Sequence, residues 1–303
     1  MEIVLITAKQ LIVMMSFMAI GYLFKKKGLF TDDASSTLSK LVVNVFLPAM
    51  VFSTFAKDFR IDVLEEKMKL LIVAVIVITV TGIAAVFLAK TFSKNKDTRA
   101  VYIYSFTIPN LSYMGYPLVK AIFGDAALLD TMVFSIPYNI YAYTIGMYLL
   151  TPIEKINLKF FLNPAIIATV AGMAVGLTGV SLPQTATSIL DMASSCMAPC
   201  AMLLTGIVFA RIDIWKMFGD WRAYAASAIR LLIIPITMLL FMRAAGLPGG
   251  WILAGTAILA MPLGLNTVVF PEAFNGDSKT GARMCFVSGL LGLITIPLVF
   301  GLL

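Results

Sequence analysis

Long apolar runs follow one another along almost the whole chain, separated by short polar segments. A helix needs about 20 apolar residues to cross roughly 30 Å of hydrocarbon, and by this measure the pattern predicts ten spans. The runs cover residues 4–24, a stretch from about 36, 70–89, a stretch after 99, 125–150, 164–180, 185–210, 222–242, 251–274 and 282–303. We therefore expect an all-α membrane protein with ten transmembrane helices.

Composition and charge support a protein whose main partner is the lipid bilayer. The 303 residues are 60% hydrophobic and 13% charged, which excludes an ordinary soluble domain. The net charge is +7. The basic residues lie between the apolar runs and form no single patch, so we expect no nucleic-acid partner. Basic residues concentrate in the loops that begin at Lys25, Lys94, Lys155, Arg211 and Lys279. The positive-inside rule places these loops in the cytoplasm, which predicts a multi-pass inner-membrane protein with both termini outside.

The residues that are absent exclude several kinds of chemistry. The chain has no histidine, which excludes a Ser-His-Asp triad, a His-ligated haem and most zinc sites. No span pairs a nucleophile with a base, and Cys196 and Cys200 lack further ligands and are interpreted as packing residues. We expect no catalytic residue, metal or cofactor, and no enzyme.

Prolines recur in the same order in the two halves of the chain. Three pairs, about 150 to 160 residues apart, are Pro48 with Pro199, Pro109 with Pro262, and Pro137 with Pro297. A five-span unit repeated after an odd number of crossings is inverted relative to the first, as in secondary transporters. The pattern predicts one repeat over 1–150 and a second over 151–303. Simple tolerance of proline in membrane helices is the alternative.

Two predicted spans, the fourth and the ninth, contain residues that break a helix near the middle of the membrane. The helix-breaking residues are Pro109 and Gly115 in the fourth span and Pro262 and Gly264 in the ninth. If the two broken spans cross, their second halves direct two helix N-termini at one cavity. Such ends carry about half a positive charge and free N–H groups, which favour an anion.

Polar side chains beside the breaks are the candidates for substrate binding. Asn110 and Asn266 come first, because an amide both donates and accepts hydrogen bonds; the alternative is that they only cap the half-helices. The further candidates are Ser112, Tyr113, Thr267, Asn44, Tyr138 and Asn139. For Asn44 the alternative is a bond to the carbonyl that Pro48 leaves free, and for Tyr138 and Asn139 it is ordinary helix packing.

Arg230 is a basic residue near the centre of a predicted span, where a charge costs on the order of 2.5–3.5 kcal/mol on insertion scales. It therefore needs a partner. One interpretation makes it the counter-charge of a carboxylate substrate. The other has it balance the C-terminal carbonyl ends of the broken helices, where cations are stabilised.

Several short motifs together resemble the auxin efflux carrier family, which includes the plant PIN proteins and bacterial malate and malonate permeases. They are Asn44 to Pro48, Pro109-Asn110 followed by Gly115 to Leu118, Asn163-Pro164, Ala198-Pro199 and Met261 to Asn266. The resemblance covers essentially the whole chain. The long hydrophilic loop of many plant PINs is here only residues 151–163, as in a compact prokaryotic-type member.

The resemblance implies the fold of bile-acid symporters and sodium/proton antiporters, with a scaffold of spans 1, 2, 6 and 7 and a transport domain of spans 3–5 and 8–10. It implies a secondary transporter that moves an organic carboxylate anion, an auxin-like monoacid or a small dicarboxylate, by alternating access. The alternatives are a sodium-coupled carrier like the bile-acid symporters, a membrane enzyme or a channel. Neither break contains Asp or Glu, which disfavours cation antiport. Gly172 and Gly176 permit close helix contact, either within the scaffold or between the protomers of a homodimer.

Overall fold

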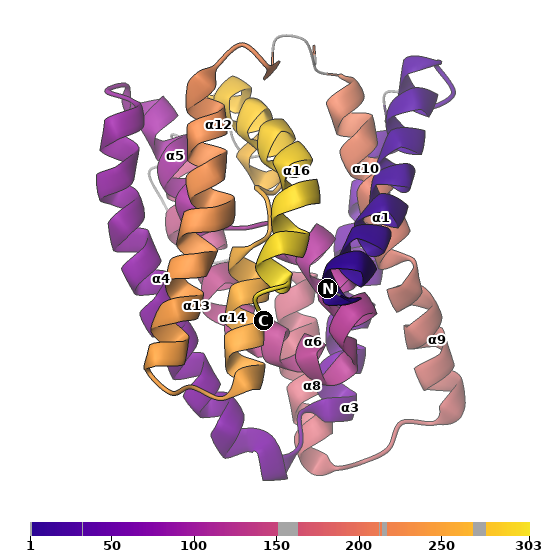
Figure 1. The fold of residues 1–303 in the computed structure, drawn as a ribbon. Helices are drawn as coiled ribbons and strands as arrows, with labels where there is room; N and C mark the ends of the chain where they lie inside the picture. Colours follow the sequence, from indigo (N-terminus) through magenta and orange to yellow (C-terminus); the bar gives the residue numbers. More distant parts are fainter. Residues whose placement is uncertain (1, 32, 151–162, 212, 214–216, 269–276) are drawn as a thin grey trace.

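The computed structural model describes residues 2–31, 33–150, 163–211, 213, 217–268 and 277–303. These residues form helices joined by turns and contain no strand (Figure 1). A helix satisfies its backbone hydrogen bonds internally, which hydrocarbon requires because it offers no other partner. The expectation of an all-α membrane protein is confirmed.

The first half of the chain contains α1 (Glu2–Lys26), α2 (Ala34–Leu41), η1 (Val42–Phe46), α3 (Leu47–Asp58), η2 (Ile61–Val63), α4 (Leu64–Phe92), α5 (Lys96–Thr107), η3 (Leu111–Gly115), α6 (Tyr116–Tyr141), η4 (Ala142–Gly146) and α7 (Met147–Leu150). The second half contains α8 (Pro164–Thr178), α9 (Gln184–Ser195), α10 (Met197–Ala210), α12 (Trp221–Ala228), η6 (Ile229–Ile233), α13 (Ile234–Ala244), α14 (Gly249–Leu259) and α16 (Ser278–Phe300).

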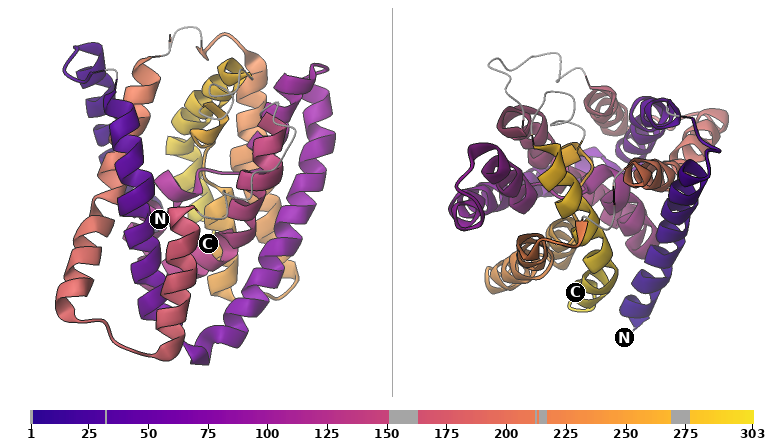
Figure 2. Two further views of the ribbon diagram at one scale, coloured as in Figure 1. Left: turned by 180° about the vertical axis from the view of Figure 1, so that it is seen from behind. Right: turned by 90° about the horizontal axis from the view of Figure 1, so that it is seen from above.

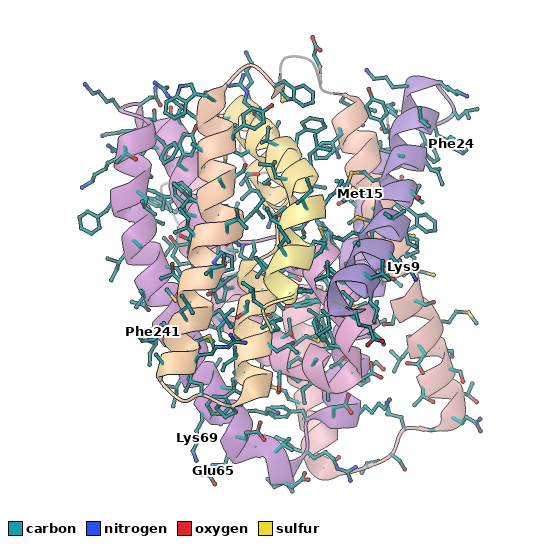
Figure 3. The ribbon with its side chains drawn as sticks, viewed as in Figure 1. Lys9, Met15, Phe24, Glu65, Lys69 and Phe241 are labelled. Carbon is teal, nitrogen blue, oxygen red and sulfur yellow. The ribbon has the colours of Figure 1, made fainter. Side chains whose placement is uncertain are left out.

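Six helical segments are long and apolar enough to cross a membrane: 2–26, 34–58, 61–92, 184–210, 221–244 and 278–300. The other predicted spans are shorter or interrupted. Helix α4 is apolar on every side: it buries Leu70 and Ala74 and exposes Ile72, Ile83 and Phe87. Such a helix suits a lipid surface. Figure 3 likewise shows Phe241 of α13, which is 57% exposed, on the outside of the bundle.

The helix ends gather at two opposite faces of the molecule (Figures 1 and 2). Helices α1, α4 and α10 end, and α2, α5 and α12 begin, at one face. Helices α3, α8 and α13 end at the other, where Figure 3 shows Glu65 and Lys69. The two chain termini lie side by side, and α1 packs against α16. The described part of the predicted cytoplasmic loops therefore lies on one face; Lys155 is outside the described residues.

Close backbone contact joins α8 to α3 and α10 to α1. A Cβ atom added at Gly176 would lie 2.4 Å from the carbonyl oxygen of Phe59 and 2.5 Å from that of Phe55. At Gly172 it would lie 2.9 Å from the Phe52 oxygen. The two glycines therefore serve contact within the chain, between α8 and α3, and are not free to mediate contact between protomers.

Three of the π-helical segments end two residues before a proline. The residue preceding each proline donates its N–H to the carbonyl five residues earlier: Leu47 to Val42, Tyr116 to Leu111 and Ile234 to Ile229. Proline removes a backbone donor and clashes with the preceding turn, and a wider turn relieves that crowding. Such bulges are frequent at functional sites. Here they occur at η1, at η3 beside Asn110, and at η6, which carries Arg230.

Helix α6 changes direction at Gly124, whose φ of 84° and ψ of −173° are not helical. Only glycine adopts this conformation readily. The part before Gly124 continues η3, and the part after it continues into η4 and α7. The predicted fourth and fifth spans therefore meet at this residue.

A buried ion pair helps to hold the start of α14. Lys67 Nζ of α4 lies 2.5 Å from Asp130 Oδ1 of α6 and 3.2 Å from Glu66 Oε1. The same Glu66 oxygen accepts a hydrogen bond from Trp251 Nε1 of α14 at 3.3 Å. The cluster thus connects three helices at the face opposite the basic loops.

Asp277 connects the beginnings of α5 and α16. Its Oδ1 accepts a hydrogen bond from Thr280 N at 3.0 Å, and its Oδ2 accepts from Thr280 Oγ1 at 2.7 Å and from Thr98 Oγ1 at 2.8 Å. Burial raises the pKa of this carboxyl group, but the hydrogen bonds from Thr280 and Thr98 and the charge of Arg283 outweigh burial. The net pKa lies below the ordinary value.

Candidate crossover site

The first break lies between α5 and η3, at Pro109 and Asn110. Ile108, before the proline, has extended backbone (φ −106°, ψ 117°), as expected for a residue that precedes proline. Asn110 has φ −75° and ψ 75°, and Leu111 N donates to Pro109 O at 2.9 Å. These values define an inverse γ-turn. The chain therefore turns sharply at Asn110 and enters η3 and α6.

The second break begins where α14 ends at Leu259, and helical geometry returns only at residues 266–268. The freed backbone groups of this segment find partners from elsewhere in the chain. Leu263 N donates to Ser288 Oγ at 3.0 Å, and Leu263 O accepts from Cys285 Sγ at 3.2 Å, both on α16. Irregular backbone inside a membrane persists only where such partners exist, so α16 supports this break.

The two breaks contact each other. Asn110 N donates to Pro262 O at 2.8 Å. A Cβ atom at Gly264 would lie 3.4 Å from Asn110 Cα, and one at Gly115 would lie 3.4 Å from Met261 Cγ. Glycine at these two positions therefore lets the segments approach closely. Segments about 150 residues apart in the sequence thus meet inside the bundle.

A cavity of about 40 Å³ lies at this contact. Seven of the predicted site and break residues line it: Asn110, Ser112, Tyr113, Asn266, Asn139, Pro109 and Gly264. Other lining residues are Val43 and Leu47 of η1 and α3, and Tyr104 of α5. The volume suffices for water molecules but not for an organic acid. A substrate therefore requires the surrounding helices to move apart.

The polar groups at the cavity include an amide side chain and the N–H groups at the start of a helix. Asn110 is 8% exposed, and its side chain makes no capping hydrogen bond and has no partner among the residues that the structure describes. The first residues of η3, and those from Gly264 to Asn266, line the same space. The N–H groups at the start of η3 belong to a helix N-terminus, which attracts negative charge, and residues 266–268 form a helical turn at the second break. Asn110 is therefore not a helix cap here, and its amide is available to a ligand.

Asn266 bonds across the site. Its Nδ2 donates to the Tyr104 hydroxyl at 3.3 Å, and so it bridges the second break to α5. Asn139 Nδ2 makes two long bonds, to Tyr116 Oη at 3.3 Å and Ser135 Oγ at 3.4 Å. No feature of the sequence predicted Tyr104 as a site residue, because it lies outside both breaks and belongs to none of the motifs. Only the packing of α5 against the second break brings it here.

Three predicted site residues lie outside the cavity lining. Asn44 is exposed, and its Nδ2 donates to Lys40 O at 2.8 Å; it does not bond its own carbonyl, the one that Pro48 leaves free. Thr267 is buried and donates from Oγ1 to Gly264 O at 2.8 Å. Tyr138 is fully buried and stacks on Phe134 of the same helix, as ordinary helix packing predicts.

Arg230 is fully buried in η6, outside the cavity at the crossover. Its Nη1 donates to Leu259 O at 2.8 Å, the carbonyl of the last residue of α14. Its Nε and Nη2 have no hydrogen-bond partner in the described part of the chain. Arg230 is absent from the cavity lining. Arg230 therefore contacts the C-terminal carbonyl end of a half-helix, as the charge-balance interpretation expects. It does not contact the cavity.

A larger apolar cleft, of about 480 Å³, opens beside the crossover. It lies between α3 and α8 on one side and α4 and α6 on the other, and it shares Leu47, Ser112 and Asn139 with the small cavity. Its other walls are mostly Phe, Leu, Ile, Val and Met side chains, with no charged residue among them. The cleft thus places apolar space directly beside the small cavity, although Asn110 itself is not among the cleft's lining residues.

An all-helical membrane fold with two contacting helix breaks is typical of membrane transport proteins. Residues 6–158 and 148–300 match a family described as "Membrane transport protein". The chain therefore belongs to this family, and its resemblance to the auxin efflux carriers is confirmed.

Relatives of similar length are also described as transporters. The chain is 23% identical over 293 residues to "Uncharacterized transporter YfdV" of Escherichia coli (strain K12), covering 93% of this chain and 92% of the relative. It is 22% identical over 299 residues to an uncharacterized transporter of Methanocaldococcus jannaschii, covering 95% and 96%. A transporter of Methanothermobacter thermautotrophicus is 23% identical over 296 residues, covering 92% of each.

Proposed function

We propose that this protein is a secondary transporter that carries an organic carboxylate anion by alternating access at the crossover of the two breaks. One observation carries the proposal: the Asn110 side chain, which has no hydrogen-bond partner among the described residues, lies in the same small cavity as the first residues of η3 and those that lead into the helical turn at 266–268. Fixed N–H dipoles and an amide donor bind a carboxylate without a counter-charge from the protein.

The apolar cleft supports a monocarboxylate with an apolar body. A ligand whose carboxylate lies at Asn110 has its remaining atoms among side chains such as Leu47, Met132 and Ile136. The second carboxylate of a dicarboxylic acid would enter a cleft that has no cation among its described lining residues, and burying an unpaired charge is costly. An auxin-like monoacid is therefore the preferred class, and a small dicarboxylate is the alternative that the test below decides.

We infer ten spans arranged as two inverted five-helix repeats, over 1–150 and 151–303. Each half contains one interrupted span, and the family matches divide near residue 150. Spans 1, 2, 6 and 7 form the scaffold in this proposal, and spans 3–5 and 8–10 form the transport domain. The small cavity volume agrees with a site that opens only when the two parts move against each other.

The sidedness of the basic loops supports an inner-membrane location with both termini outside. A homodimer through the scaffold is also proposed. It is supported by the exposed apolar side chains of α9, where Ile189 is 64% and Met192 is 73% exposed. Neither the location nor the homodimer depends on the chemistry of the crossover.

A thermal-shift screen of purified protein tests the substrate class, because a ligand that binds only the folded state raises the melting temperature. Apolar monocarboxylates, such as aryl-acetates, are compared with malate and malonate and with the matching uncharged amides. We expect the monocarboxylates alone to stabilise the wild type. Stabilisation by dicarboxylates alone would select the alternative class, and equal stabilisation by the amides would contradict anion recognition.

Transport is then measured in proteoliposomes with the ligand that the screen identifies. A carrier shows saturable uptake and counterflow, whereas a channel shows neither. Asn110→Ala and Asn266→Ala should impair both binding and uptake. Asn44→Ala is the matched control, because Asn44 lies outside the cavity lining.

A further inference from the structure

The environment of Arg230 is unusual for a buried charge. Arginine stays protonated in proteins, and Arg230 is fully buried about ten residues into the apolar segment 221–244. No ion pair joins it to a carboxylate in the described part of the chain, and its ionisable neighbour there is the Tyr138 phenol. Among the described residues, the groups that contact this positive charge are therefore not acidic side chains.

The carbonyl ends of half-helices supply that balance. Leu259 O is one of the terminal carbonyls of α14 and receives Arg230 Nη1 at 2.8 Å. Segment η6, which carries Arg230, also packs against α5, the half-helix that ends at Thr107 beside the other break. The C-terminus of a helix carries roughly half a negative charge. One such end thus accepts a hydrogen bond from this fixed cation, and the segment that carries the cation packs against the half-helix of the other break.

In transporters with interrupted helices, the C-terminal ends of half-helices and the unwound carbonyls hold the coupling cation. We propose that Arg230 is a tethered cation that takes the place of this ion, so that the protein needs no sodium to complete its crossover. The inference rests on the crossover proposed above. It concerns how the charge of Arg230 is balanced when no substrate is bound, and not how the substrate binds. Because Arg230 does not line the cavity, its position does not support the alternative in which it is the counter-charge of the substrate.

Apo protein provides the test, so a wrong substrate assignment does not affect it. Arg230→Ala removes Cγ, Cδ and the guanidinium group, which together correspond to ethylguanidinium. Ethylurea is the uncharged analogue of nearly the same shape. Melting temperatures are measured in detergent for wild type and Arg230→Ala with neither compound, with millimolar ethylguanidinium or with millimolar ethylurea. Wild type is also measured in sodium chloride and in choline chloride of equal concentration.

We expect Arg230→Ala to lower the apo melting temperature by roughly 5–15 °C, because the helix ends lose their cation. Ethylguanidinium should restore at least half of this loss, and ethylurea should restore none. Wild type should melt at the same temperature in both salts. Equal rescue by ethylurea, or no rescue by either compound, would overturn the proposal, as would a saturable stabilisation of wild type by sodium.

Arg243→Ala is the matched control. Arg243 also donates to a backbone carbonyl, from Nη2 to Leu302 O, but it is exposed. This variant should respond equally to the two compounds. If Arg230→Ala does not survive purification, Arg230→Lys and Arg230→Met are compared, because they have similar volumes and differ in charge. A melting temperature of Arg230→Met equal to or above that of Arg230→Lys would show that the charge is not needed.

Discussion

Replacing Asn110 by alanine separates binding from folding at the crossover. The backbone of Asn110 joins the two breaks through its N–H, which donates to Pro262 O, and its carbonyl accepts from Gly115 N at 3.0 Å within the first break. Alanine keeps both bonds. The side chain that is removed has no hydrogen-bond partner in the described residues, so its loss should change the apo melting temperature by only a few degrees.

Binding should respond much more strongly. A hydrogen bond from a neutral donor to a buried charged group contributes about 1–3 kcal/mol, which corresponds to a loss of affinity of about 5- to 150-fold. Asn110→Asp should be worse than alanine, because two unit charges 4 Å apart repel by about 4 kcal/mol at an effective dielectric constant of about 20. Aspartate is a good residue at a helix N-terminus, so this variant should remain folded while it loses the anion.

Binding isotherms and apo melting temperatures of wild type and the two variants make the comparison. The expected order of affinity is wild type, then alanine, then aspartate, at nearly constant apo stability. Wild-type affinity in Asn110→Ala would place the substrate elsewhere. Tighter binding of the carboxylate by Asn110→Asp would contradict anion binding at this amide.

The remaining predictions concern packing, pH, topology and coupling. Gly176→Ala should destabilise the protein by about 1–3 kcal/mol, because its Cβ meets the Phe59 carbonyl; Gly289→Ala, which meets nothing within 4 Å, should be neutral or stabilising in the same melting assay. The pKa of Asp277 is lowered in the folded protein, so its contribution to stability is present above the ordinary carboxyl pKa and is lost as the pH falls through the lowered pKa. The melting temperature of the wild type should therefore fall on acidification by an amount that Asp277→Asn lacks. A single cysteine at Lys26, with the native cysteines removed, should resist an impermeant reagent added to intact cells, and labelling from outside would reverse the proposed orientation. Uptake into proteoliposomes should persist when potassium replaces sodium, and a strict sodium requirement would favour a bile-acid-symporter-like mechanism.

The class of the protein and the location of its breaks followed from the sequence, because both depend on local physics. Apolar runs of membrane length require helices wherever they occur in the chain. Pro109 and Pro262 interrupt a helix through their own missing N–H groups, whatever surrounds them. The family resemblance depended on the same residues, which is why the motifs beside the breaks identified it.

Relations between distant segments depended on the tertiary structure. Asn44 and Asn110 are similar in sequence, as polar residues near prolines, yet packing places Asn110 in the cavity and leaves Asn44 bonded to Lys40. The sequence left two roles open for Arg230, as the counter-charge of the substrate or as the charge that balances a helix end. Its position outside the cavity lining favours the second role. Gly176 was compatible with contact inside the chain or between protomers until α3 was seen against it. In each case the residue's chemistry is local, but its partner comes from a segment far away in the chain, and only packing brings the two together.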